Sequence, residues 1–261
     1  MIALRHSELE VSDYNSCLGL KSYAPDVVVN TAAFHKTDQC EDEPLRAMTV
    51  NAVGARNVAV VTRGIGAACV YISTDYVFDG NKGQPYTEDD VPSPVNAYGI
   101  SKLAGELFTR QNPKHYVIRV ASLFGSAGAS GKGGNFVETM LTKFRNKENI
   151  SVIDDNWMSP TYTRDAAGAL RKLLERPSPY GTYHLTNQGY CSWYQLTLEI
   201  FRLLGFEAAV TPSKSVPQPN KAKRPVFSAL TSLRLGAMGV VMPSWQTALG
   251  EYLREKGYLK S

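Results

Sequence analysis

Two short stretches of the chain carry side chains that could pass a proton to a carbonyl oxygen. Tyr98 and Lys102 are four residues apart, and on a helix this spacing places both side chains on one face. A free phenol has a pKa of about 10, and a lysine ammonium one helical turn away is expected to lower it. Ser73 and Thr74 lie upstream, just before Asp75, and either hydroxyl could hydrogen-bond the same carbonyl. By itself, the Tyr-x-x-x-Lys spacing is also typical of a half-buried tyrosine beside a solvated lysine.

The elements around these stretches are expected to bring them to one edge of a sheet. Ser73 ends an apolar run that begins at Cys69, which predicts a buried strand, and Tyr98 lies near the start of a predicted helix. Open α/β folds bind their ligands outside the carboxyl ends of the strands. The predicted elements are, in chain order, a strand over residues 1–4, a helix over 14–23, a strand over 27–30, a helix over 45–62, a strand over 69–73, a helix over 96–110, a strand over 116–121, a helix over 136–145, a strand near Val152, a helix over 164–175, a strand over 183–185, and helices over 192–204 and 244–256, with an extended loop over 212–225 before the last helix.

Strand and helix alternate through the first half of the chain, which predicts an α/β fold with a Rossmann-like, doubly wound parallel sheet. After Ala121 a glycine-rich segment changes this rhythm. We therefore expect a nucleotide-binding core over residues 1–124 and a smaller, interleaved C-terminal lobe over residues 125–261. The lobe is expected to bind mainly substrate, and some of its segments are expected to return to the core.

Composition and charge exclude several classes of protein. The chain has 261 residues and a formal net charge of +4, and its small basic cluster of Lys221, Lys223 and Arg224 is too limited for a nucleic-acid footprint. Its four cysteines are far apart and show neither a disulfide framework nor a metal-ligand spacing, so we expect no metal site and a reducing cytoplasm. The longest apolar tract, residues 58–72, is interrupted by Arg63 and is too short to span a membrane.

A set of motifs spread over nearly the whole chain is more specific than any single one. They are residues 26–33 (DVVVNTAA), 50–52 (VNA), 73–80 (STDYVFDG), 98–106 (YGISKLAGE), 134–140 (GNFVETM), 154–155 (DD), 159–162 (SPTY), 181–185 (GTYHL) and 224–225 (RP). In this combination the chain resembles the extended short-chain dehydrogenase/reductases, and among them the dTDP-4-dehydrorhamnose reductase family. One departure is Ser122, which stands where members of that family often carry tryptophan.

The resemblance implies transfer of a hydride from NADPH or NADH to the C4 keto group of dTDP-4-dehydro-6-deoxy-L-mannose, which yields dTDP-L-rhamnose. By this resemblance Tyr98 is the general acid, Lys102 holds the cofactor ribose and tunes Tyr98, and Thr74 orients the carbonyl. The other implied contacts are Ala32, Ala33, Asn51 and Ser73 with the cofactor, and Asp75, Tyr76, Asn135 and Arg224 with the substrate, Arg224 at its pyrophosphate.

The front of the chain departs from the dinucleotide-binding pattern. That fold binds the pyrophosphate on a Gly-rich turn after its first strand and selects the ribose at the end of its second. Residues 1–4 match the second strand, so the glycine fingerprint would have to precede residue 1 and the sheet is expected to be N-terminally truncated. Arg5 would then suit the 2′-phosphate of NADP, unless it is an ordinary solvated arginine. We expect weak cofactor affinity and low stability from a chain of this kind, whether it reflects a late start codon, a truncation or a degenerate gene.

A second glycine pattern is a decoy for that fingerprint. Gly125, Gly128 and Gly131 follow a predicted strand and precede a predicted helix. No strand with a ribose-selecting acid follows them in a βαβ frame, so we interpret the segment as a flexible loop.

Two other functions fit the same residues. One is a noncatalytic regulatory subunit that resembles the β subunit of methionine adenosyltransferase, and the other is a reductase or epimerase of a different nucleotide sugar. The fold and the Thr74, Tyr98 and Lys102 triad serve many functions and do not discriminate among them. The expected partner is a dTDP-sugar, with a possible homodimer and neither nucleic acid nor membrane.

Overall fold

A parallel sheet of four strands forms the centre of the protein. The computed structural model describes residues 1–127, 134–216, 218–219 and 221–260. The strands, in their order across the sheet, are β1 (Val27–Asn30), β2 (Ala68–Thr74), β3 (His115–Val120) and β8 (Gly181–His184). The apolar runs of β1 and β2 are typical of strands covered on both faces, and all but one residue of β2 is buried. The predicted Rossmann-like α/β fold is thereby confirmed.

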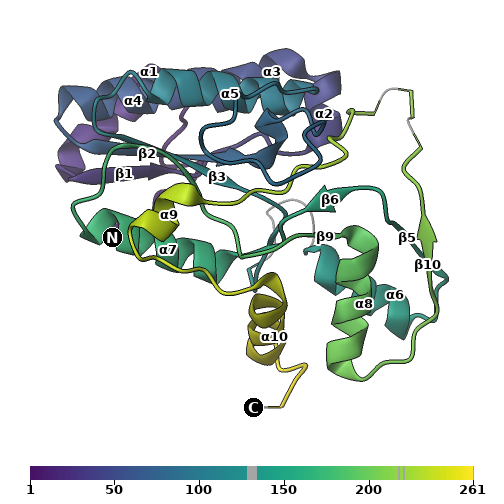
Figure 1. The fold of residues 1–261 in the computed structure, drawn as a ribbon. Coiled ribbons are helices and arrows are strands. Elements are labelled where there is room, and N and C mark those ends of the chain that lie inside the picture. The colour runs from purple at the N-terminus through teal and green to yellow at the C-terminus, as the bar shows by residue number, and fades with distance from the viewer. Residues whose placement is uncertain (128–133, 217, 220, 261) are drawn as a thin grey trace.

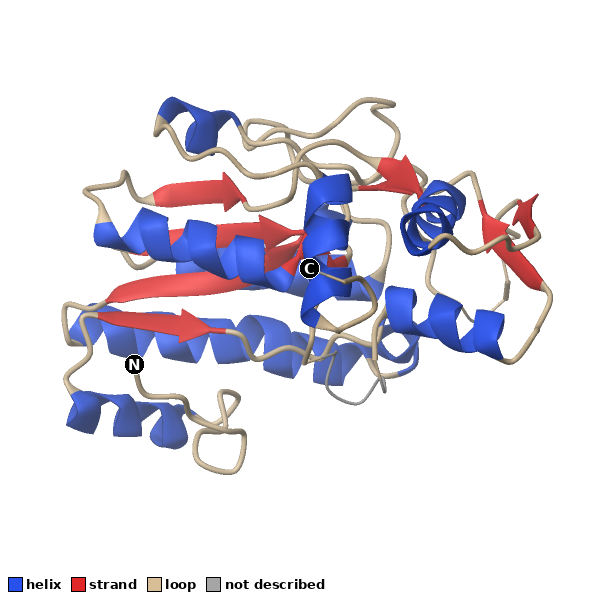
Figure 2. Cartoon of the chain, turned by 90° about the horizontal axis from the view of Figure 1, so that it is seen from below, coloured by secondary structure: helices blue, strands red, loops and turns tan. Residues whose placement is uncertain are grey.

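Helices cover both faces of this sheet (Figures 1 and 2). Val58 and Val61 of one helix pack with Cys69 on one face, whereas Ala169 and Leu173 of another pack on the opposite face. The helices of the first face are α1 (Tyr14–Leu18), α3 (Pro44–Met48), α4 (Gly54–Gly64) and α5 (Ala97–Thr109), those of the second are α7 (Thr163–Glu175) and α9 (Leu233–Ala237), and α2 (Thr37–Asp42) lies at the end of the first layer nearest the lobe.

The predicted helix over residues 45–62 is confirmed, with one irregularity. Between α3 and α4 the chain forms a π-helical turn over Thr49–Val53. Turns of this kind are frequent at functional sites. Asn51 lies within the turn and is fully buried, and its carbonyl accepts a hydrogen bond from the hydroxyl of Tyr71 at 2.8 Å. The turn therefore ties this helix to β2.

A second apolar core lies in the C-terminal half of the chain, beside the sheet (Figure 1). Three helices supply most of its buried side chains, among them Leu141, Ile200 and Leu249. The elements of this lobe are α6 (Phe136–Arg145), α8 (Trp193–Leu204), α10 (Trp245–Glu255), and the strand pairs β5 (Ile150–Ile153) with β10 (Val210–Ser213), β4 (Leu123–Phe124) with β7 (Thr161–Tyr162) and β6 (Trp157–Met158) with β9 (Cys191–Ser192). α7 and β8 also belong to this half of the sequence and pack against or join the central sheet.

Two sequence-based expectations are wrong. Residues 1–4 form no strand, and Met1 and Ile2 are exposed. A strand must pair its backbone groups, and among the described residues the only neighbour of β1 is β2. The loop expected over residues 212–225 begins as a strand, because Pro212 and Ser213 pair with Val152 and Ile153.

Gly128 and Gly131 of the glycine pattern lie outside the described residues. In the part of the chain that the structure describes, no helix is long and apolar enough to cross a membrane.

Candidate active site

The predicted catalytic stretches meet at the carboxyl end of β2. The strand ends at Thr74, whose side chain accepts a hydrogen bond from the backbone N–H of Tyr76 and so starts a 3-10 turn. α5 begins after Asn96, whose side chain caps the N–H of Gly99 at 2.8 Å. A Cβ at Gly99 would lie 2.1 Å from the carbonyl oxygen of Tyr76, so only glycine lets the helix approach the turn this closely. This contact fixes the start of α5, including Tyr98, against the strand end.

Tyr98 lies among the side chains that the sequence predicts beside it. Its hydroxyl is hydrogen-bonded to Thr74, and the rings of Tyr76 and Tyr98 are edge to face with centroids 6.1 Å apart. Burial raises the pKa of Tyr98 above its usual value, the charge of Asp75 adds to the rise, and the Thr74 hydrogen bond opposes it. The expectation of a lowered pKa for this phenol is therefore wrong in the structure.

The direction of Lys102 explains that difference. Its ammonium donates to the carbonyl oxygen of Ile72 at 2.6 Å and lies 4.0 Å from the centroid of the Tyr71 ring. The charge is thus directed onto β2. Burial lowers the pKa of Lys102 to about 7, and the carboxylate of Glu106, one turn further along α5, opposes that fall.

The two neighbouring hydroxyls have different surroundings. Ser73 is buried and donates to the Oε1 atom of Glu106 at 2.6 Å. Thr74 donates to the Oδ1 atom of Asp75 at 3.0 Å and contacts Tyr98. The spacing of residues leaves both hydroxyls open as partners for a carbonyl, whereas the family resemblance implies Thr74. The geometry favours Thr74, because the Ser73 hydroxyl is already bonded to Glu106.

Asp75 is a buried carboxylate beside the tyrosines. Besides Thr74, it accepts a hydrogen bond from the hydroxyl of Ser228 at 2.5 Å. Burial raises the pKa of Asp75 to about 6, although both hydroxyls act in the opposite direction. At neutral pH the carboxyl is therefore mostly ionised, but the pH is close to its titration midpoint.

Arg224 reaches the same site from the C-terminal half of the chain. Its Nη2 atom lies 3.0 Å from Oδ1 of Asp38, its Nη1 atom donates to the carbonyl of Ala222 at 3.0 Å, and it hydrogen-bonds the side chain of Tyr76. The nearby ammonium of Lys221 lies 3.7 Å from Oδ2 of Asp38. Two partly exposed cations thus flank the Asp38 carboxylate beside the site. Their charges could also attract a bound anion.

Asn51 shapes the loop that follows β1. Its side chain hydrogen-bonds both backbone groups of Phe34, at 2.8 and 3.0 Å, and the hydroxyl of Ser101 at 2.9 Å. Ala32 and Ala33 are half-buried in this loop. Small side chains at these two positions leave the loop backbone accessible to a flat ligand.

Two predicted site residues are not joined to this cluster by any contact among the described residues. Arg5 is exposed, and its backbone N–H donates to Glu8. Asn135 caps α6, where its Oδ1 accepts from the N–H of Glu138 at 3.2 Å and its Nδ2 donates to the hydroxyl of Tyr252 at 3.0 Å. The structure thus gives Asn135 a role in the lobe, and its contact with substrate stays a prediction.

Sequence reasoning missed several residues that support the site. Glu106 appears in a recognised motif, but nothing in the sequence alone shows that its carboxylate is fully buried and paired with Arg119 at 2.8 Å. The one available signal is its spacing, four residues after Lys102 and eight after Tyr98. Asp38 and Ser228 come from segments far apart in the sequence, and no local pattern announces them.

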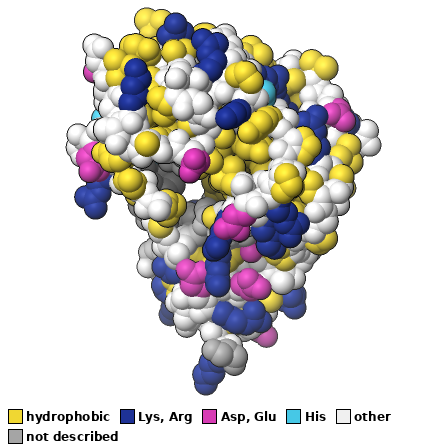
Figure 3. Space-filling model, turned by 90° about the vertical axis from the view of Figure 1, so that its left-hand side faces the viewer, with side chains coloured by type: hydrophobic (Ala, Val, Ile, Leu, Met, Phe, Trp, Pro, Cys, Tyr) yellow, Lys and Arg dark blue, Asp and Glu magenta, His cyan; other side chains and the backbone are white. Residues whose placement is uncertain are grey.

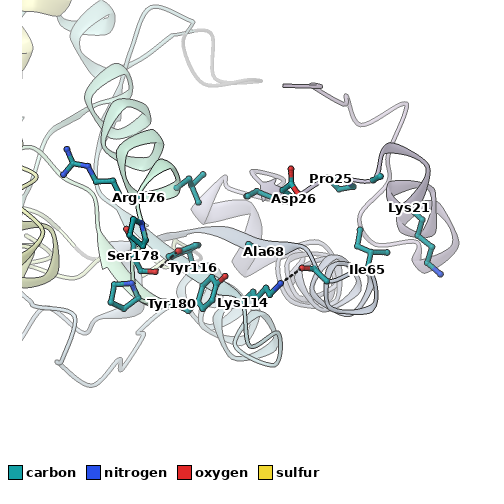
Figure 4. Close-up of a pocket in the computed structure, with 16 residues that line it drawn as sticks. Lys21, Pro25, Asp26, Ile65, Ala68, Lys114, Tyr116, Arg176, Ser178 and Tyr180 are labelled. Atoms are coloured by element: carbon teal, nitrogen blue, oxygen red, sulfur yellow. Dashed lines mark hydrogen bonds between the residues drawn. The ribbon is translucent and has the colours of Figure 1, made fainter.

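A cavity of about 800 Å³ lies at the opposite edge of the sheet, around the first residues of β1, β2 and β3, and contains none of the predicted site residues. Figure 3 faces this end of the molecule and shows apolar side chains and several Lys and Arg side chains there. The close-up shows Lys21 and Arg176 directed away from its centre (Figure 4), and Lys114 donates to Gly66. Because its cations do not converge, we do not regard this cavity as the active site.

The parallel sheet with a Tyr and Lys pair and a threonine hydroxyl at its carboxyl edge defines a protein of the short-chain dehydrogenase/reductase class. The sequence model of one family, described as RmlD substrate binding domain, matches residues 1–257, and the chain belongs to this family.

Known proteins support the assignment. The chain is 40% identical to the spore coat polysaccharide biosynthesis protein SpsK of Bacillus subtilis over 98% of this chain and 89% of the relative. It is 37% identical to a dTDP-4-dehydrorhamnose reductase of Streptomyces griseus over 95% of this chain and 83% of the relative. Among solved structures, it is similar to the dTDP-4-dehydrorhamnose reductase of Bacillus anthracis in complex with NADP, with a TM-score of 0.89, 36% identity, and coverage of 97% of this chain and 88% of that one. The structure of a dTDP-4-dehydrorhamnose reductase of Clostridium acetobutylicum is similar with a TM-score of 0.91 and 37% identity. The match covers 98% of this chain and 90% of that one.

Proposed function

We propose that the protein is a sugar-nucleotide reductase that uses NADPH or NADH to convert dTDP-4-dehydrorhamnose to dTDP-L-rhamnose. The observation that carries the proposal is the meeting of Thr74, Tyr98 and Lys102 at the carboxyl edge of β2. Relatives named as dTDP-4-dehydrorhamnose reductases favour this function over a noncatalytic subunit. They also favour it over action on another nucleotide sugar.

The side chains of the site divide the reaction between them. A raised pKa keeps Tyr98 protonated at neutral pH, so its hydroxyl can give a proton to the C4 oxygen as that atom gains negative charge. Thr74 orients the carbonyl through its hydroxyl. The nicotinamide cofactor, when bound, would supply the hydride to C4, which balances the proton delivered to oxygen.

The residues present fit such a cofactor. The loop after β1 carries the small side chains of Ala32 and Ala33, held in place by Asn51. We assign Lys102, on the catalytic helix, to a ribose hydroxyl of the cofactor, which its ammonium would bind in addition to the carbonyl of Ile72. Ser73 contributes only by its backbone, because its hydroxyl is bonded to Glu106.

The substrate side of the site follows from charge and shape. Asp75 and Tyr76 form the wall nearest Tyr98, and Arg224 offers a planar guanidinium that suits pyrophosphate oxygens. Since Arg224 is bonded to Asp38, a pyrophosphate would replace or share that carboxylate. Asn135 remains a proposed contact at the far side, and Arg5 a proposed contact to a 2′-phosphate.

Replacement of Tyr98 by phenylalanine tests the proposal. We expect Tyr98→Phe to lower kcat by about a hundredfold to ten-thousandfold, because the proton donor is lost. NADPH oxidation in the presence of dTDP-4-dehydrorhamnose measures turnover, and calorimetry checks that cofactor binding is retained. Tyr14→Phe, on an exposed tyrosine in α1, is the matched control. Normal turnover by Tyr98→Phe would exclude the assigned mechanism.

Three further statements about the protein are proposals of the same kind. We propose action in the cytoplasm, which the wide spacing of the four cysteines along the sequence supports, since it shows no disulfide framework. The division into a core over residues 1–124 and a lobe over residues 125–261 stays a prediction. A homodimer is also still a prediction, which sedimentation analysis would test.

A further inference from the structure

The last three residues of β2 are each bonded to the same face of α5. Residues at positions i, i+4 and i+8 of a helix lie along one face, and the three partners on α5 have this spacing. The contacts are the Ile72 carbonyl with Nζ of Lys102 at 2.6 Å, the Ser73 hydroxyl with Oε1 of Glu106 at 2.6 Å, and the Thr74 side chain with the hydroxyl of Tyr98.

Of these three helix residues, Glu106 has the most firmly held side chain. It is fully buried, and its carboxylate is bound by Arg119 of β3 through Nε at 2.9 Å and Nη2 at 2.8 Å. A two-point guanidinium–carboxylate pair fixes both partners in orientation as well as in distance. Arg110 adds a third contact at 3.2 Å from the next turn of α5. Glu106 therefore has little freedom to follow a movement of β2.

We propose that Glu106 is a positioning residue of the reaction, which anchors Ser73 and thereby sets where the neighbouring Thr74 lies relative to Tyr98. The proposal rests on the proposed function, because Tyr98 and Thr74 act on the substrate there. Glu106 is fully buried and its carboxylate is occupied by Ser73 and two arginines, so we assign it no contact with substrate or cofactor. It acts through one hydroxyl at the strand end.

The same anchor affects the charge of Lys102. The Ile72 carbonyl precedes Ser73, so a strand end that is released from Glu106 also releases the acceptor of the Lys102 ammonium. The groups that face this ammonium are the Ile72 carbonyl, the Tyr71 ring and the Glu106 carboxylate, with Arg119 and Arg110 behind Glu106. Loss of either the carbonyl or the carboxylate favours neutral Lys102.

Ser73→Ala is the sharpest test, because it removes one hydroxyl and leaves the Glu106–Arg119 pair intact. We expect kcat to fall about tenfold to a hundredfold, while KM for the dTDP-sugar and for NADPH changes less than about twofold. The matched control is Thr62→Val, which removes a buried hydroxyl that donates to Val58 in α4, outside the site. This variant should lose a similar amount of thermal stability and keep the wild-type kcat.

A titration that does not depend on turnover provides the second measurement. The protein is labelled with 13C-lysine, and the NMR signal of Lys102 is identified by its loss in Lys102→Met. The shift of this signal with pH gives the titration midpoint of the Lys102 side chain. We expect Ser73→Ala and Glu106→Gln each to lower that midpoint by about one pH unit and Thr62→Val to leave it unchanged. Wild-type kcat and an unshifted Lys102 midpoint in Ser73→Ala would overturn the proposal. If the wild-type chain does not reduce the sugar, the proposed function fails, and the titration alone then decides whether Glu106 anchors the strand end.

Discussion

Asp75 is a residue that the fold holds at an energetic cost. Burial raises its pKa from 3.8 to about 6, so the unfolded chain gives up this proton more readily than the folded protein. The stabilisation that protonated Asp75 contributes is therefore fully present below pH 3.8 and is lost as the pH rises through 6. A buried charge of this kind is typical of functional sites, which tolerate it because the chemistry needs the group.

This cost can be measured with Asp75→Asn, which keeps the size of the side chain and removes its titration. Between pH 5 and pH 8 we expect the wild-type free energy of unfolding to fall by about 1 kcal/mol relative to that of the variant. Urea unfolding at the two pH values gives the difference. Parallel pH profiles for the two proteins would show that Asp75 titrates normally in the fold.

At the residue scale, the sequence predicts the chemical types of the site but not their directions. Tyr98, Lys102 and Thr74 follow from spacing and from their place after a strand. The direction of the Lys102 ammonium toward Ile72 depends on the packing of α5 against β2, which no local pattern encodes. For the same reason the residue pattern alone could not choose between Ser73 and Thr74, and only the family resemblance points to Thr74.

The contact of α5 with its neighbours depends on two glycines of that helix. A Cβ at Gly105 would lie 2.4 Å from the Asn51 carbonyl oxygen and 2.4 Å from the Tyr71 hydroxyl, and both of these residues are buried. Neither neighbour can move away without breaking the hydrogen bond between them. The glycine thus lets the catalytic helix lie directly against the π-helical turn.

Gly105→Ala is therefore expected to destabilise the protein by about 1 to 3 kcal/mol through overpacking. Gly168→Ala provides the matched control, since that position is exposed in α7 and has nothing within 4 Å of an added Cβ. This control should stabilise the protein by about 0.5 to 1 kcal/mol through helix propensity. Thermal unfolding of both variants checks the contrast, and equal stability of Gly105→Ala and the wild type would contradict the packing argument.

At the element scale, long periodic segments are predictable and short paired ones are not. The helix over residues 136–145 has the predicted bounds, because its apolar period and the Asn135 cap are local signals. β4, β6, β7 and β9 have two residues each and exist only through partners elsewhere in the chain. Residues 1–4 show the converse, since they have a strand-like composition but no partner strand among the residues that the structure describes.

On the scale of the whole molecule, buried polar groups connect the sheet with the C-terminal half. His184 of β8 accepts from Nη1 of Arg119 at 3.4 Å, and its Nδ1 donates to the carbonyl of Thr231 at 2.9 Å. Both ring nitrogens are satisfied in the neutral tautomer with its proton on Nδ1. Glu88 accepts from the backbone N–H of His184 and from the hydroxyl of Ser232. The Arg119 that holds Glu106 is thus part of a network that reaches both halves.

The contribution of His184 to the free energy of unfolding should depend on pH with the opposite sign to the contribution of Asp75. Burial and the charge of Arg119 lower the pKa of His184, and Glu88 opposes them. The unfolded chain therefore takes up this proton first, and stability is lost as the pH falls below about 6.5. On acidification from pH 7 to pH 5 we expect the wild type to lose about 1 to 2 kcal/mol relative to His184→Gln. Over the same interval Asp75→Asn should lose more stability than the wild type, because it lacks the gain that comes from protonation of Asp75. Urea unfolding of the three proteins at both pH values therefore separates the two groups. Equal losses of stability in all three proteins would contradict both assignments.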